Sequence, residues 1–121
     1  MTPFVLEQGR ESSFEELPEA LLGAFRSLVG ALGEGRPAVV VLRDVDIAGR
    51  GDPAAAAYAH ALLGLVRALA IEGARDGWVI NAVSIADDAP AHAWVERLGQ
   101  PEGLSGALLR LGDGHLGRIP A

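Results

Sequence analysis

The stretch that decides the fold runs from Pro37 to Ser84 and reads PAVVVLRDVDIAGRGDPAAAAYAHALLGLVRALAIEGARDGWVINAVS. It opens with a continuous β-branched and apolar run at Ala38–Leu42, which predicts a strand covered on both faces. Glycines and Pro53 separate this run from a long apolar segment at Ala54–Ala74, which predicts a helix. A second apolar strand is expected at Trp78–Val83. Strand, helix and strand in this order are typical of a parallel βαβ unit.

The flanking sequence continues the same alternation. A short apolar run at Pro3–Leu6 predicts a strand. From Ser13 to Leu32 apolar residues recur at helical spacing, and Ser13 with Glu16 has the spacing of a capping box. A shorter helix is expected at Ala91–Leu98 and a last strand at Ala107–Leu111.

These elements predict one α/β domain over residues 1–121. The expected architecture is a partial Rossmann-like three-layer sandwich, with a mainly parallel sheet of about four strands and helices on both faces. A chain of 121 residues is long enough for a single core of this kind.

Composition narrows the classes of function. The net charge of −6 argues against binding nucleic acid or an anionic membrane through a basic surface. Without cysteine there is no disulfide, thiol nucleophile or thiolate metal site, and the scattered His60, His92 and His115 give no metal-site spacing. No uninterrupted apolar run approaches 18 residues, so we expect a cytoplasmic protein without a membrane segment. The Ala, Gly and Arg bias with no lysine suggests a GC-rich bacterial genome.

The expected helix at 54–74 is apolar almost all round. Between Ala54 and Ile71 its only strongly polar residues are His60 and Arg67. Such a helix needs burial beyond the side that meets its sheet. Either another subunit or the first helix of the same chain covers the sides of this helix that do not meet the sheet. The residues expected at an interface between subunits are Phe25, Leu28, Leu32, Ala61, Leu65, Ala68 and Leu69.

The middle of the chain resembles the short-chain dehydrogenase/reductase family. In that family a strand carries a catalytic serine, the next helix bears Tyr-x-x-x-Lys, and the following strand reads close to R-V-N-A-V. Here Tyr58 has the place of the tyrosine, Leu62 stands where the lysine belongs, and Val45 falls at the serine position. The strand with Asn81 matches N-A-V, and Gly103–Gly117 is similar to the terminal strand and turn of the family.

The resemblance implies a truncated pseudoenzyme. It covers only the second half of the family's fold, and the glycine-rich cofactor turn of the first half has no counterpart here. It therefore implies no confident catalytic residue and no cofactor bound by this chain alone, with NAD(P) expected, if at all, in a partner subunit. In the family, the two helices that match 14–32 and 54–74 form a common dimer interface, a four-helix bundle.

Three hypotheses of function follow. The first is a non-catalytic subunit that associates with a full-length short-chain dehydrogenase/reductase to stabilise or regulate it. The second is a residual oxidoreductase, or a module that binds a small acyl or carbonyl ligand. The third is a self-associating structural domain, a homo-oligomer through the same two helices. The first is favoured because the apolar helix needs a partner and the first strand leaves an open sheet edge.

Overall fold

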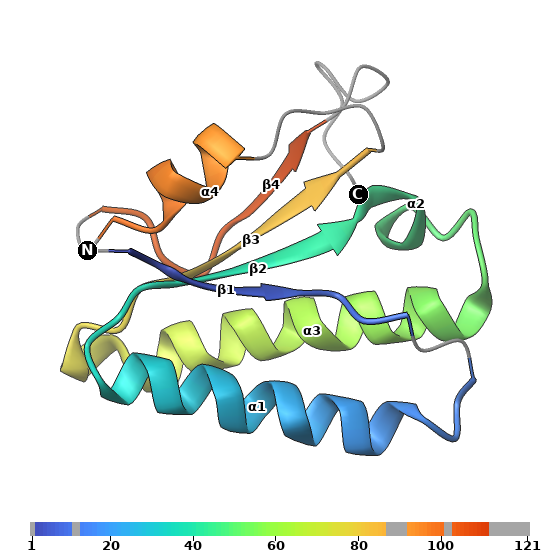
Figure 1. Ribbon diagram of the computed structural model, residues 1–121, viewed down its shortest axis with the longest axis horizontal. Helices are drawn as coiled ribbons and strands as arrows, with labels where there is room; N and C mark the ends of the chain where they lie inside the picture. The colour runs from blue at the N-terminus through green and yellow to red at the C-terminus, as the bar shows by residue number, and fades with distance from the viewer. Residues whose placement is uncertain (1, 11–12, 87–91, 101–102, 112–121) are drawn as a thin grey trace.

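The computed structural model describes residues 2–10, 13–86, 92–100 and 103–111. One sheet of four parallel strands forms its centre, in the order β1-β2-β3-β4 (Figure 1). The strands are β1 (Phe4–Glu7), β2 (Ala38–Arg43), β3 (Ile80–Ile85) and β4 (Leu108–Leu111). The predicted α/β Rossmann-like sandwich with a four-stranded parallel sheet is confirmed.

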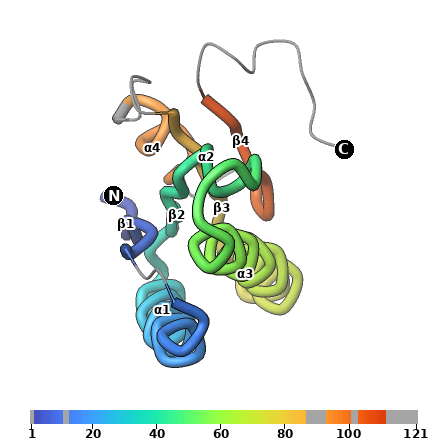
Figure 2. Tube along the Cα trace, turned by 90° about the vertical axis from the view of Figure 1, so that its right-hand side faces the viewer, coloured from blue at the N-terminus to red at the C-terminus, as the bar shows by residue number. Residues whose placement is uncertain are grey.

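The helices form two unequal layers. The long helices α1 (Leu17–Gly33) and α3 (Pro53–Glu72) lie side by side on one face, and α4 (His92–Leu98) lies on the other (Figures 1 and 2). Two short elements complete the fold, α2 (Asp44–Ile47) after β2 and the 3-10 turn η1 (Ala74–Asp76) before β3. Since the strand order never reverses, the β3–α4–β4 connection has the opposite hand to the two before it. It departs from the right-handed rule that about 98% of such connections obey.

The main core lies between the sheet and the two long helices. Val40 and Leu42 of β2 and Ala82 of β3 pack there against Leu62 and Val66 of α3. Alternate residues of a strand face the opposite side, so the intervening positions of β2 and β3 face the α4 layer. Burial on both faces explains why these two strands read as near-continuous apolar runs.

Element boundaries differ from expectation mainly at the start of α1. This helix begins at Leu17 rather than near 14, because residues 13–16 form a turn in which the Leu17 amide donates to the Phe14 carbonyl over 3.4 Å. Glu16 accepts a hydrogen bond from the Ser13 amide at 3.2 Å, but within that turn and not as a helix cap. The start of α3 is capped by Asp52, whose carboxylate accepts from the Ala55 amide at 3.1 Å.

Helix α3 is covered partly by the sheet and partly by α1. Tyr58 of α3 lies against α1, where its hydroxyl donates to the Ala20 carbonyl over 3.4 Å. One side of α3 is therefore covered by another helix of the same chain. By length and composition alone, α3 is the one described helix that could cross a membrane, with a mean hydropathy of 1.6. In this structure it packs against the sheet beside α1.

Candidate functional site

Polar side chains gather at the carboxyl ends of the four strands. Gln8 follows β1, Asp44 and Asp46 lie in α2 directly after β2, Ser84 lies in β3 and Arg110 in β4. Open parallel sheets bind ligands at this edge. Both aspartates are only 3% exposed. A carboxylate buried to this extent needs hydrogen-bonded partners.

Asp44 is held by the two strands on one side of it. Arg110 donates from Nε to Oδ1 over 2.8 Å and from Nη2 to Oδ2 over 3.1 Å, and Ser84 donates from Oγ to Oδ1 over 2.6 Å. The two-bond geometry with arginine is the strong form of a carboxylate ion pair. The bonds from Ser84 and Arg110 to the Asp44 carboxylate connect α2 to β3 and β4.

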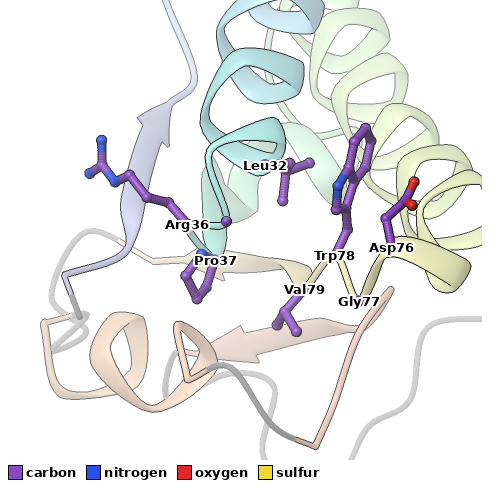
Figure 3. A pocket seen from close by; sticks show the side chains of 8 residues that line it. Leu32, Arg36, Pro37, Asp76, Gly77, Trp78 and Val79 are labelled. Carbon is purple, nitrogen blue, oxygen red and sulfur yellow. The ribbon is translucent and has the colours of Figure 1, made fainter.

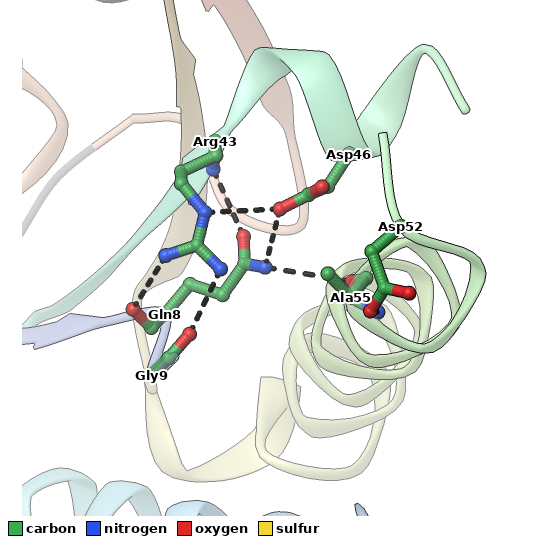
Figure 4. A network of polar contacts seen from close by, with 6 residues as sticks. All are labelled: Gln8, Gly9, Arg43, Asp46, Asp52 and Ala55. Atoms are coloured by element: carbon green, nitrogen blue, oxygen red, sulfur yellow. Dashed lines mark hydrogen bonds and ion pairs between the residues drawn. The ribbon is translucent and has the colours of Figure 1, made fainter. Parts of the chain in front are cut away.

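Asp46 is held by residues of β2 and of the segment that follows β1 (Figure 4). Its Oδ2 accepts from Gln8 Nε2 at 2.9 Å and from Arg43 Nε at 3.0 Å. The guanidinium of Arg43 also donates to the carbonyl oxygens of Gln8, at 3.3 Å, and Gly9, at 2.9 Å. The backbone amide of Arg43 donates to Gln8 Oε1 at 2.9 Å. The end of β1 is thereby fastened to β2 and α2.

The arrangement favours binding and bracing over proton transfer. Each buried aspartate accepts charge-assisted hydrogen bonds from an arginine, Asp44 from Arg110 and Asp46 from Arg43. Among the described residues there is no group of three histidine, aspartate or glutamate side chains placed to hold a metal ion. A chain without lysine also offers no lysine amine to lower the pKa of a neighbouring acid.

The three positions taken from the resemblance do not meet in one site. Tyr58 is buried with its hydroxyl toward α1. Leu62 is completely buried in the core between α3 and the sheet. Val45 lies at the carboxyl edge, but its side chain is 48% exposed while its neighbours Asp44 and Asp46 point inward. The side chains that build the edge are therefore those two aspartates.

The seven predicted interface residues divide into two groups. Leu28, Leu32 and Leu69 are buried inside the chain's own core and are closed to a partner in this structure. Phe25 and Ala68 are exposed, and Ala61 and Leu65 are half-buried, so these four remain at the surface of the helix pair. Two large apolar side chains that were not predicted are also exposed on these helices, Leu22 and Ile71.

Asn81 braces the opposite part of the fold. Its side chain is fully buried, and Nδ2 donates to the carbonyl oxygens of Leu98 at 3.2 Å and Leu104 at 2.8 Å. Its Oδ1 accepts from the Ala107 amide at 3.0 Å. One amide thus joins β3 to the end of α4 and to the segment entering β4, which is a structural role.

A small cavity lies at the amino ends of the strands, far from the polar edge (Figure 3). Leu32, Arg36, Pro37, Trp78 and Val79 contribute to its wall, and its volume is about 40 Å³. A cavity of this size holds water molecules but no organic ligand. The carboxyl edge is accordingly a better candidate for a functional site than this cavity.

The aspartate and arginine pairs of the edge were not foreseen from the sequence. The available signal was the position of Asp44 and Asp46 immediately after a buried strand. Arg43 is only three positions from Asp46, but the other partners are distant in the chain, at 38 positions for Gln8–Asp46 and 66 for Arg110–Asp44. Comparison of the chain with protein-family models and with curated proteins gives no match.

Proposed function

We propose that this chain is a non-catalytic subunit resembling the short-chain dehydrogenases/reductases, which associates with a full-length member of that family and stabilises or regulates it. One observation carries the proposal: α1 and α3 lie side by side on one face of the sheet, and their outer surfaces still carry apolar side chains. In the short-chain dehydrogenases/reductases that this chain resembles, the two helices that match α1 and α3 pack against the helices of another subunit.

The chemistry of this outer surface suits helix packing. Leu22 and Phe25 of α1 are 46% and 42% exposed. On α3 the exposed positions include Ala57, Gly64 and Ala68, whose small side chains allow another helix to approach closely. Apolar side chains gathered in this way are typical of surfaces that bind another protein. A pair of helices from a partner would complete a four-helix layer.

The non-catalytic part of the proposal rests on the three positions that match the family's catalytic residues. Val45 offers no hydroxyl, Leu62 is an apolar core residue, and Tyr58 is committed to α1. With Leu62 in place of the family's lysine, the residue that lowers the pKa of the tyrosine in that family is missing from this position. NAD(P) chemistry would then belong to the partner subunit.

The open edge of β1 adds a second, independent argument. Within the described sheet β1 pairs only with β2, so one side of β1 has no strand beside it. Exposed strand edges are usually paired or covered. Association with a larger partner supplies a way to cover this edge as well as the helix pair.

The test is capture of the tagged 121-residue protein from its native cells, followed by the native mass of the complex. We expect a stoichiometric partner whose sequence retains the serine, tyrosine and lysine of the family. Phe25→Asp should abolish the complex, because it places a charge beside the exposed Leu22 on the outer surface of α1. The matched control is Leu104→Asp, a change at an exposed apolar residue outside α1 and α3. A complex made only of copies of this chain would contradict the proposal and favour the self-associating domain.

A further inference from the structure

Two adjoining grooves cut into the carboxyl edge of the sheet. The first, about 720 Å³ in volume, is lined by residues 7–10 after β1, 41–43 of β2, and 85–86 after β3. The second lies next to it and is lined by residues 43–45, Ala48, Arg50 and again 85–86. Both grooves share Arg43, Ile85 and Ala86, so they meet at these three residues. The size of the first falls in the range of about 300–1,000 Å³ that is usual for small-molecule sites.

Arg43 stands at this junction with its side chain already fixed. Three of its N–H groups donate, to Asp46 and to the carbonyl oxygens of Gln8 and Gly9. A guanidinium has five N–H groups, so two are left, and no described residue accepts them. The side chain is 32% exposed and opens onto both grooves. A guanidinium held this way loses little conformational freedom when it binds a ligand.

Two further arginines flank Arg43. Arg10 lines the first groove and Arg50 the second; both are exposed, and neither side chain has a hydrogen bond or ion pair to a described residue. Asp46 balances the charge of Arg43, and among the described residues of the two walls Glu7 is the only unpaired acid. Asp87 and Asp88, next along the chain, lie outside the described residues. Arginines at the walls outnumber the unpaired acids in a chain whose net charge is −6.

We propose that Arg10, Arg43 and Arg50 form a binding site for a small oxyanion, a molecule that carries a carboxylate or phosphate group. The two remaining N–H groups of Arg43 donate to the oxyanion, and Arg10 and Arg50 attract it from either side. Arginine suits this role because its planar donors match carboxylate and phosphate oxygens. The site is independent of the outer surface of α1 and α3, so it stands or falls separately from the proposed association.

The first experiment is calorimetric titration of the full 121-residue chain with sodium malonate and with inorganic phosphate. Sodium chloride at matched ionic strength serves as the reference, because exposed arginines attract any anion weakly. We expect saturable binding of at least one of the two. Binding of malonate alone assigns a carboxylate ligand, and binding of phosphate alone assigns a phosphate-bearing one. Absence of saturable binding by both overturns the proposal.

Variants then locate the site. Arg10→Ala and Arg50→Ala should each weaken binding about tenfold, the loss of one charge-assisted contact. Neither side chain has a hydrogen bond or ion pair to a described residue, so both variants should keep the stability of the parent chain. Arg43→Lys should weaken binding at least as much, because a lysine keeps the charge but not the planar donors. The matched control is Arg75→Ala, at an exposed arginine in η1 at the other end of the sheet. Equal weakening by Arg75→Ala would show nonspecific screening and overturn the proposal.

Discussion

Arg110 and Asp44 are joined by two hydrogen bonds of 2.8 and 3.1 Å, although 66 positions separate them in the sequence. The pair links β4, the last strand of the sheet, to α2 at the end of β2. Ser84 of β3 adds a third bond to the same carboxylate. One buried aspartate therefore fastens three neighbouring strands at the edge where the grooves lie.

Removal of this carboxylate should be costly. Asp44→Ala leaves Arg110, whose side chain is mostly buried, without its counter-charge. We expect the free energy of unfolding to fall by about 3 kcal/mol, as is usual when one partner of a buried pair is removed. Urea denaturation measures the loss. In a double-mutant cycle, Asp44→Ala with Arg110→Ala should cost less than the two single changes added together. Simple additivity would mean that the pair contributes no coupling.

Two glycines should respond to alanine in opposite directions. A Cβ at Gly73 would lie 2.3 Å from the indole ring of Trp78, so Gly73→Ala must displace that ring and should destabilise the fold by about 2 kcal/mol. Gly30, inside α1, has nothing within 4 Å of the added Cβ. Gly30→Ala should raise stability by about 0.5–1 kcal/mol through helix propensity alone. Thermal unfolding checks both changes: Tm should fall for Gly73→Ala and rise for Gly30→Ala, relative to the parent chain.

Asn81→Asp tests the brace between β3, α4 and β4. The substitution keeps an acceptor for the Ala107 amide but turns an oxygen toward the carbonyl groups of Leu98 and Leu104. A buried carboxylate facing two carbonyls should cost about 3 kcal/mol or more. Asn81→Ser, which places no charge there, is the milder comparison. An aspartate variant as stable as the parent in chemical denaturation would contradict the role given to this amide.

Restoration of the family's lysine should damage the fold. Leu62 is completely buried, so Leu62→Lys puts an ammonium group into the core. We expect a loss of several kcal/mol, on the order of 3–5, in the free energy of unfolding. Ala57→Lys on the exposed side of the same helix should change stability by less than about 0.5 kcal/mol. A stable, well-folded Leu62→Lys protein would show that position 62 can reach solvent after all.

The strands and long helices could be predicted because their signals are local. The apolar runs of β2 and β3 and the periodic spacing of α1 depend only on neighbouring residues. The start of α1 was misplaced for a local reason too. Ser13 and Glu16 have capping-box spacing, yet they interact within the turn that precedes the helix.

The polar edge could not be predicted from the sequence in the same way. Asp44 and Asp46 look like ordinary loop acids until the sheet brings Arg110 and Gln8 beside them. The four-residue helix α2 that holds both aspartates is too short to leave a periodic pattern. The exposure of Leu22 and Phe25 and the burial of Leu28 likewise depend on how α1 is rotated against the sheet, which spacing alone does not set.

The reversed hand of the last connection divides the molecule into unequal cooperative units. From β1 to β3, each strand joins its sequence neighbour under one continuous layer made of α1 and α3. The β4 strand and α4 stand outside that layer; they are held by the pairing of β4 with β3, by Asn81 and by the Arg110–Asp44 pair. This part should open first in partial unfolding, so its amides should exchange with solvent well before those of β2. The grooves at the carboxyl edge therefore lie on the part of the fold that opens later, the part that contains β1, β2 and β3.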